Sequence, residues 1–334
     1  MLDTIQTQPA PAIIHTPREQ WLLARAERVT STDAADLICH ALGDDSAYRA
    51  PAEILAAKWG LTDDIEASEP MKWGNRLQRV IGEVYAEETG REVRPVEEYS
   101  IWQHPDLDWL SASGDAIYSE PTGYRARPLE IKTDGSRWQD GAVPFRHQVQ
   151  SMIQQACLGV DGGAVTAFVD RFRPLISQDI AFNRRFFDSC LPLLEEFRHY
   201  LKTRTLPSDP TWYTKAAVKA FWPNGNGALV AFDHDELRLV NRWERLKTFR
   251  KWAEEQKDVC EVALAVRLGD AESGLLPDGS SYRLKRSLVA AQSCECGHVI
   301  RTEHTRSVPS RFWPKHLKPA RKTIASPTNG TKEN

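Results

Sequence analysis

The sequence predicts a mixed α/β (α+β) fold, in which a central mixed β-sheet is flanked by helices and followed by a C-terminal helical extension. Three observations predict it. Apolar residues follow helical spacing up to residue 89, and strand-like runs then begin at residue 93. Two further helical stretches interrupt and follow those runs. Beyond residue 208 the pattern changes to a long, charged helix. A chain of 334 residues can bury a substantial core in one large or two smaller domains.

The helices that precede the sheet are marked by their ends. Ser31, Thr32 and Asp33 offer capping oxygens to a helix that continues through Ala34, and Pro51 suits the first position of a helix over 51–59. A longer amphipathic helix is predicted over 70–89, ended by Gly90. Its apolar face would carry Leu77, Val80, Ile81, Val84 and Tyr85.

The sheet is predicted from short apolar runs bounded by turn residues. The first strands are expected at 93–102, 109–118 and 127–133. The last two form a hairpin whose turn contains Gly123. A helix over 144–158, strands at 164–170 and 176–182, and a helix over 184–203 complete the core.

Four segments are predicted along the chain. They are a flexible leader (1–17), a core (18–207), a helical extension with a small hairpin (208–300) and a basic irregular tail (301–334). In the extension, Asp233 and Glu236 form a capping box for a helix that reaches Cys260 or further, and the hairpin lies near 275–284. The tail contains eight Lys or Arg residues and two acids.

The charge balance excludes a uniformly cationic protein. Lys plus Arg number 43 and Asp plus Glu 46, a net charge of −3, so any nucleic-acid surface must be local. No apolar run is long enough to cross a membrane, and the first residues lack the features of a secretory signal. We therefore expect thiols rather than disulfides, with Cys39, Cys157, Cys190 and Cys260 in the core. Cys294, Cys296 and His298 leave open a metal site or ordinary thiols.

Two neighbouring blocks carry the candidate chemistry, Ser113-Gly114-Asp115 and Leu129-Glu130-Ile131-Lys132. Strand alternation puts Glu130 and Lys132 on one face, within reach of Asp115 on the paired strand, and turns Ile131 to the core. Two carboxylates suit Mg²⁺, which activates water for attack on a phosphodiester, and an ammonium can orient that water. The alternative is an exposed strand with alternating charges. The apolar setting of both strands favours the catalytic interpretation.

Five blocks in this order resemble the lambda-type phage exonucleases and YqaJ-like viral recombinases, a branch of the PD-(D/E)XK nuclease superfamily. The likeness spans about residues 18–205. The blocks are Trp21–Arg25 with Val29–Ala34, Lys72–Leu77 with Thr89-Gly90, Ser111–Asp115, Leu129–Thr133 and Val143–Gln150. The resemblance implies a restriction-endonuclease-like core.

The resemblance also implies roles for individual residues. Asp115, Glu130 and the Ile131 carbonyl would hold the metal ion. Lys132 and Gln148 would orient the attacking water. Arg25 and Thr32 match positions that bind a terminal 5′-phosphate, although Thr32 could equally be a plain helix cap. Two departures from the family pattern are Phe145, where Tyr is common, and Gln78, where the family has Glu. Gln78 brings no negative charge.

The implied function is a Mg²⁺-dependent exonuclease, with Mn²⁺ as a substitute, that resects linear duplex DNA from 5′ ends for phage-type recombination. The implied partners are double-stranded DNA ends, a single-strand annealing protein and further copies of the chain in a ring trimer. The expected location is the cytoplasm of a bacterium or phage-infected cell. The alternatives are an endonuclease of the same superfamily and a catalytically weak DNA-end-binding or scaffolding protein, which Gln78 makes conceivable.

Overall fold

The computed structural model describes residues 13–15, 17–62, 68–121, 125–133, 138, 142–169, 174–289, 292–293, 299–301 and 304–312. Its contacts divide the chain into two compact units, Met1–Gly227 and Ala228–Asn334. The elements of the first unit are β1 (Ile13–His15), α1 (Arg18–Glu27), β2 (Val29–Thr30), α2 (Ser31–Leu42), α3 (Pro51–Lys58), α4 (Glu69–Thr89), β3 (Glu92–Pro95), β4 (Ser100–Gln103), β5 (Leu110–Ala112), β6 (Ala116–Ser119), β7 (Arg127–Lys132), α5 (Phe145–Leu158), β8 (Gly162–Ala167), β9 (Ile176–Ala181), α6 (Arg184–Thr203), the 3-10 helix η2 (Pro210–Trp212) and α7 (Lys215–Phe221).

A five-stranded mixed sheet is the centre of the first unit, with strand order β3-β6-β7-β8-β9. The β6–β7 pair is antiparallel and places Ala116 opposite Leu129, so the predicted hairpin is confirmed. The β7–β8 pair is parallel, and α5 provides the crossover between the two strands. β9 then returns antiparallel to β8. The predicted mixed sheet flanked by helices is therefore confirmed.

Two predicted strands are each divided between different sheets. The prediction of one strand over 93–102 is wrong, because β3 lies in the five-stranded sheet and β4 in a four-stranded sheet of order β1-β4-β5-β2. Tyr99, with φ 63°, lies between them. The prediction of one strand over 109–118 is wrong for the same reason, since β5 and β6 belong to different sheets. The chain crosses between the sheets at residues 113–115.

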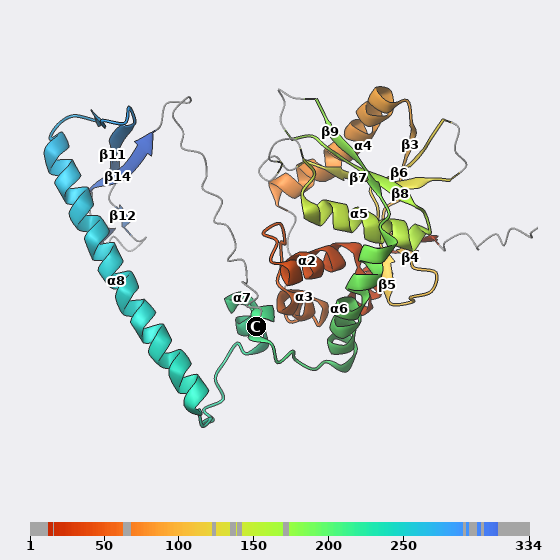
Figure 1. The fold of residues 1–334 in the computed structure, drawn as a ribbon, viewed down its shortest axis with the longest axis horizontal. Helices are drawn as coiled ribbons and strands as arrows, with labels where there is room; N and C mark the ends of the chain where they lie inside the picture. The colour runs from red at the N-terminus through yellow and green to blue at the C-terminus, as the bar shows by residue number, and fades with distance from the viewer. Residues whose placement is uncertain are drawn as a thin grey trace, which may run out of the picture. The chain divides into compact units, whose positions relative to one another are not determined.

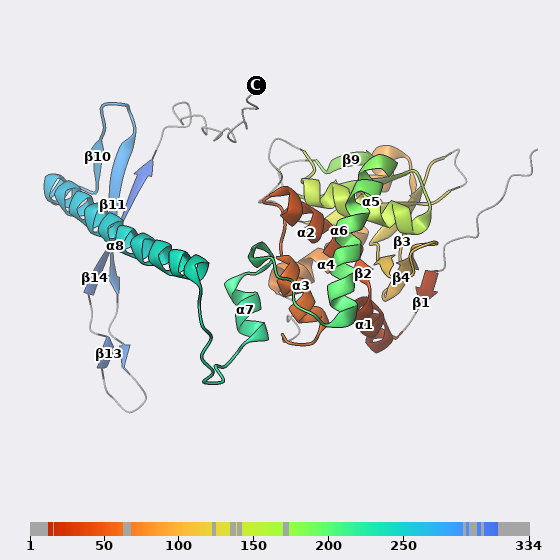
Figure 2. The same ribbon diagram turned by 60° about the horizontal axis from the view of Figure 1, so that its bottom comes forward.

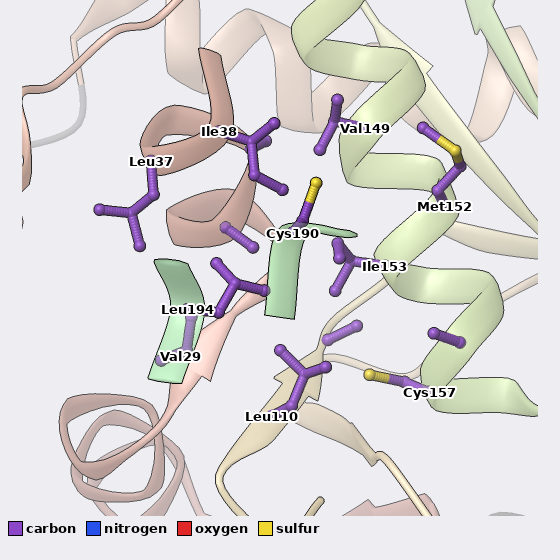
Figure 3. Packing of buried hydrophobic residues seen from close by; sticks show 14 of the residues in the cluster. Val29, Leu37, Ile38, Leu110, Val149, Met152, Ile153, Cys157, Cys190 and Leu194 are labelled. Atoms are coloured by element: carbon purple, nitrogen blue, oxygen red, sulfur yellow. The ribbon is translucent and has the colours of Figure 1, made fainter. Parts of the chain in front are cut away.

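Helix α5 lies at the centre of the packing. Twelve of its fourteen residues are buried, and it contacts β7 and β8 on one side and α2, β4 and β5 on the other. Figure 3 shows Val149, Met152, Ile153 and Cys157 of α5 beside Leu37 and Ile38 of α2 and Leu194 of α6. This cluster fixes α5 against one face of the five-stranded sheet.

Helix α4 covers the opposite face of the same sheet (Figure 1). Ser68 caps its first turn, and Gly90, with φ 71°, ends the helix where the sequence predicts. Ile81 and Tyr85 pack against Leu129 and Ile131 in a second buried cluster. Ile131 therefore faces the core, and Glu130 and Lys132 face away from α4 towards α5.

The second unit contains one long helix and short strands (Figure 2). The elements are α8 (His234–Leu268), β10 (Ser273–Leu275), β11 (Ser281–Val289), β12 (Gln292–Ser293), β13 (Val299–Arg301) and β14 (His304–Phe312). Asp233 and Glu236 form the predicted capping box, and β10 pairs with β11 as the predicted hairpin. The boundary at Gly227 lies beyond the predicted one at 207, because α7 packs on α3.

The cysteines of the described residues divide into two groups. Cys39, Cys157 and Cys190 are buried free thiols, as predicted, and burial raises the pKa of Cys39 to about 11. Cys260 was expected in the core and is exposed on α8, because no residue of this helix is buried. Cys294, Cys296 and His298 lie outside the described residues.

Candidate active site

The structure brings Asp115, Glu130 and Lys132 together at one end of the five-stranded sheet. Asp115 directly precedes β6, and its carboxylate Oδ2 accepts a hydrogen bond from the Ile131 backbone amide at 2.8 Å. Glu130 is 2% exposed, and its Oε1 accepts a hydrogen bond from the Lys132 ammonium. The convergence expected from the hairpin is therefore present, and the roles of these residues remain predictions.

Gly114 permits the close passage of the chain that positions Asp115. A Cβ atom at this position would lie 2.0 Å from Cη2 of Trp102, a fully buried indole in β4. Such a distance is far inside van der Waals contact, so a larger residue would push this link away from the sheet. Packing against Trp102 of the neighbouring sheet therefore requires glycine at position 114.

Two buried glutamines of α5 hold Glu130 from the other side. Gln150 Nε2 donates to Glu130 Oε1 at 2.7 Å, and Gln154 Nε2 donates to Glu130 Oε2. Gln154 Nε2 also donates to the Ser113 carbonyl at 3.1 Å, so one amide joins the loop before β6 to the strand β7. The sequence analysis did not select either residue. The two residues are four positions apart, which places their side chains on the same face of the helix beside the sheet, and this spacing is the sequence signal that could have identified them.

Gln148 does not join this group. Its Nε2 donates to the Val143 carbonyl at 2.8 Å, within the turn at the start of α5. A separation of two residues along a helix rotates the side chain by about 200°, so Gln148 and Gln150 point in different directions. Gln150, not Gln148, is the residue in contact with Glu130, and the role of Gln148 stays a prediction.

Gln78 reaches the site from α4. Its Nε2 donates to Asp115 Oδ1 at 2.9 Å, so both carboxylate oxygens of Asp115 have partners. The position that distinguishes this chain from the family pattern therefore lies in direct contact with a candidate metal ligand. The amide donates a hydrogen bond where a Glu side chain would add negative charge.

Charges are strongly coupled in this group. Burial and the neighbouring Glu130 carboxylate raise the pKa of Asp115 well above its usual range. Burial alone would lower the pKa of Lys132, but Glu130 and Asp115 raise it above the ordinary value. Lys132 is therefore a protonated donor at neutral pH. A cation between the two carboxylates would relieve the repulsion that disfavours their ionisation.

The donor set fits a hard divalent cation. Asp115 and Glu130 lie one position beyond the paired Ala116 and Leu129, so their two carboxylates are at the same level of the adjoining chains, and Mg²⁺ is commonly held by one or two carboxylates with several waters. The Oε1 atoms of Gln150 and Gln154 are buried and have no hydrogen-bond partner among the described residues. Such amide oxygens can accept hydrogen bonds from water bound to a metal ion. Within the described residues, no cluster of three or more His, Cys, Asp or Glu side chains forms a metal site.

Arg25 lies beside the candidate site, and its environment is partly aromatic. Its guanidinium stacks on the Trp21 ring, 4.5 Å from the centroid, and Nη1 donates to Ser113 Oγ at 3.4 Å. Thr32 stands in the first turn of α2 and is partly exposed. The cap of α2 is Thr30, whose hydroxyl accepts from the Asp33 amide at 3.3 Å, so the interpretation of Thr32 as a plain cap is wrong.

A buried group of ion pairs connects the start of α2 to the candidate site. Asp33 pairs with Lys58 Nζ at 2.8 Å and with Arg49 Nη2 at 3.0 Å. Burial would raise the pKa of Asp33, but these two cations hold it far below its usual range. Asp36 pairs with Arg146 of α5 at 2.7 Å. The sequence analysis missed this group because its members are spread over more than 100 residues.

No helix in the described part of the chain is long and apolar enough to cross a membrane.

Comparison with known proteins agrees with the resemblance seen in the sequence. Residues 20–160 match the family model of the YqaJ-like viral recombinase domain. The structure is similar to an alkaline exonuclease, LHK-Exo from Laribacter hongkongensis, and to the same exonuclease in complex with dAMP. Both matches show 21% sequence identity, a TM-score of 0.44, and coverage of 56% of this chain and 93% of the exonuclease. No curated protein matches the sequence. The stretch that matches this family model, residues 20–160, includes Asp115, Glu130 and Lys132.

Proposed function

We propose that the protein is a metal-dependent exonuclease that resects linear duplex DNA from 5′ ends for phage-type recombination. The observation that carries this proposal is the contact group of Asp115, Glu130 and Lys132 on adjoining strands, inside the domain matched by the recombinase family. Buried carboxylates with a raised pKa and a specific charged partner are typical of functional sites.

In this proposal Asp115, Glu130 and the Ile131 carbonyl hold Mg²⁺, and Mn²⁺ can substitute. Bound Mg²⁺ would lower the pKa of a water and neutralise charge on the scissile phosphodiester. Lys132 stays protonated, so it donates hydrogen bonds to the attacking water or to a phosphate oxygen and does not remove a proton. Gln150 and Gln154 fix the Glu130 carboxylate, leaving their amide oxygens to accept from water.

Recognition of the DNA end is assigned to Arg25 and Thr32. Arg25 contacts Ser113, two residues from Asp115, so an anion bound by its guanidinium would lie close to the carboxylates. A planar guanidinium suits a terminal phosphate because it can donate two parallel hydrogen bonds. The same end would be passed through a homo-oligomeric ring, with the remaining strand delivered to an annealing protein.

The test uses purified full-length protein and 5′-phosphorylated linear duplex DNA. With Mg²⁺ we expect digestion of the linear substrate, no cutting of covalently closed circles, and loss of activity in EDTA. Asp115→Ala and Lys132→Ala should each abolish digestion while leaving the circular dichroism spectrum unchanged. Activity that survives both changes would refute the site. Arg25→Ala should remove the preference for a 5′-phosphate over a 5′-hydroxyl, with less effect on the rate at saturating DNA.

A second candidate function is supported by Gln78. Its amide donates to Asp115 at 2.9 Å and adds no charge to the site, as expected of a protein that binds DNA ends with little or no turnover. That function predicts tight binding of duplex ends without digestion at any Mg²⁺ or Mn²⁺ concentration. Cutting of closed circles would instead identify an endonuclease.

A further inference from the structure

Helix α8 exposes an unusual number of large apolar side chains. It has 35 residues, about 52 Å at 1.5 Å per residue, and none of them is buried. Trp243 is 60% exposed, Phe249 61% and Trp252 53%. Further exposed apolar residues lie along its length: Leu237, Leu239, Val240, Leu246, Val259, Val262, Leu264 and Val266. Apolar surface of this extent on a soluble helix marks a contact surface.

The charges of α8 are distributed unequally between its two halves. The basic half, residues 234–251, has six Lys or Arg and three acids, a net charge of +3. The acidic half, residues 252–268, has two Lys or Arg and four acids, a net charge of −2. The intrahelical pairs Lys251–Glu255 and Lys257–Glu254 lie at the junction of the halves. Outside these two pairs, residues 234–251 keep a net charge of +2 and residues 252–268 a net charge of −1.

We propose that α8 pairs antiparallel with α8 of a second copy of this chain, about a two-fold axis near residue 252. In this arrangement each basic half lies against an acidic half, and a two-fold axis makes both contacts identical. A parallel pair would set basic against basic and acidic against acidic, which is repulsive. The partner helix then covers the apolar face that contains Leu239, Trp243, Leu246 and Leu264, which lie within about 60° of one another around the helix.

A nucleic acid fits this surface less well than a second copy does. The basic half could contact phosphates, but the acidic half would repel the same duplex. Phosphate contacts would also leave the exposed Trp243, Leu246 and Leu264 uncovered. A second copy accounts both for the charges and for the apolar face that contains these three residues.

The first experiment measures self-association of the full chain by sedimentation equilibrium. Trp243→Ala/Leu246→Ala should weaken association at least about tenfold, because the apolar contact is lost. Asp258→Lys/Glu261→Lys should weaken it similarly, and so should Arg242→Glu/Arg245→Glu, because each creates like charges in the antiparallel pair. An equimolar mixture of the two charge variants should associate nearly as tightly as the unmodified chain. The matched control is Glu195→Lys/Glu196→Lys, an equal charge change on exposed positions of α6.

Circular dichroism of each variant shows that the helix is retained. Unchanged association in the Trp243→Ala/Leu246→Ala and both charge variants would overturn the proposal. A monomer at all concentrations would do the same, since α8 would then be covered by its own chain or exposed. The measured quantity is the difference in association between each α8 variant and the control.

The second experiment determines the direction of pairing with a spin label on Cys260. Cys39, Cys157 and Cys190 are buried, so Cys294→Ser/Cys296→Ser in the full chain leaves Cys260 as the accessible thiol of the described residues. Residue 260 lies eight positions from the proposed axis. Antiparallel pairing therefore places the two labels about 24 Å apart along the helices. Parallel pairing would bring them to the same level, about 10 Å apart. The shorter distance, or the absence of dipolar coupling, would overturn the proposed arrangement.

Discussion

Gln154→Met tests whether α5 positions the candidate metal ligand Glu130. Gln154 is fully buried, and its Nε2 donates both to Glu130 Oε2 and to the Ser113 carbonyl. Methionine keeps the length and volume of the side chain but removes both hydrogen bonds. Glu130 retains Gln150 and Lys132 as partners, so the carboxylate stays in the cluster but is free to rotate.

The expected loss of stability follows from the bonds removed. A hydrogen bond to a charged group contributes about 1.5–3 kcal/mol and one to a neutral carbonyl about 0.5–1.5 kcal/mol. Removing Gln154 Oε1, which has no partner among the described residues, offsets about 1–3 kcal/mol of this loss. The net loss should be about 1 kcal/mol. With an ordinary stability of about 5–15 kcal/mol, almost all of the variant remains folded at 25 °C.

The loss of activity should exceed what unfolding explains. Groups that hold a metal ligand commonly contribute about 10–100-fold in metal affinity or rate. The assay is digestion of linear duplex as a function of Mg²⁺ concentration, beside urea unfolding of the same preparation. We expect a higher Mg²⁺ requirement together with a lower maximal rate.

Gln155→Met is the matched control. Gln155 is the next residue of α5, is equally buried, and donates to the Ile180 carbonyl at 2.9 Å and to Ser151 Oγ at 3.2 Å. Its two neutral hydrogen bonds contribute about 1–3 kcal/mol, and removing its own Oε1, which also has no partner among the described residues, offsets a similar amount, so stability should change by about 1 kcal/mol or less. The Mg²⁺ dependence should not change. Equal losses of activity in both variants, or full activity in Gln154→Met, would refute the positioning role.

Three further changes test the surroundings of the site. Gln78→Glu should raise the rate and the affinity for Mg²⁺, measured by titration of digestion, because it adds a carboxylate beside Asp115; no change would show that this position does not contribute. Gly114→Ala should lower stability by about 1–3 kcal/mol in thermal unfolding, because the new methyl group overlaps a buried indole. It should also abolish digestion, and an active, stable variant would contradict the packing described here. Lys58→Met should cost about 3 kcal/mol in urea unfolding at pH 7, because Asp33 loses its closest buried cation. Because the pKa of Asp33 is lowered in the folded protein, its ionised form stabilises the fold fully above the pKa of Asp33 in the unfolded chain, and this stabilisation is lost as pH falls. Below pH 4 the difference in unfolding free energy between Lys58→Met and the unmodified protein should therefore shrink.

Local signals predicted most of the helices and the hairpin of the site. Arg184–Thr203 and the end of α4 at Gly90 follow from amphipathic spacing and caps, which act within a few residues. Residues 93–102 and residues 109–118 are each predicted as one continuous strand, because apolar residues lie on both sides of the point where the observed strand is interrupted. Which sheet receives a strand is decided by tertiary packing, and the close passage of Gly114 against Trp102 carries no local signature.

Helix spacing could not distinguish Gln148 from Gln150 for a related reason. Amphipathic spacing reveals which face of a helix meets a sheet only when another face is in solvent. Helix α5 is buried almost all round, between the five-stranded sheet and α2, so its sequence has no polar face from which to read a direction. Gln148 and Gln150 were therefore equivalent in the sequence, and only the contact with Glu130 distinguishes them.

The ion pairs beside the site reconcile a net charge of −3 with the proposed DNA substrate. Lys132 interacts electrostatically with Arg146, and Arg25 with Asp33, so these charges form a continuous group from the carboxylates to the start of α2. It contains four cations besides Lys132, namely Arg25, Arg49, Lys58 and Arg146, and two acids, Asp33 and Asp36. The excess of two positive charges lies next to the site, where low polarisability strengthens its attraction for a phosphate. A local excess of this kind suits an enzyme that holds one DNA end, since a uniformly basic surface would also bind duplex far from its ends.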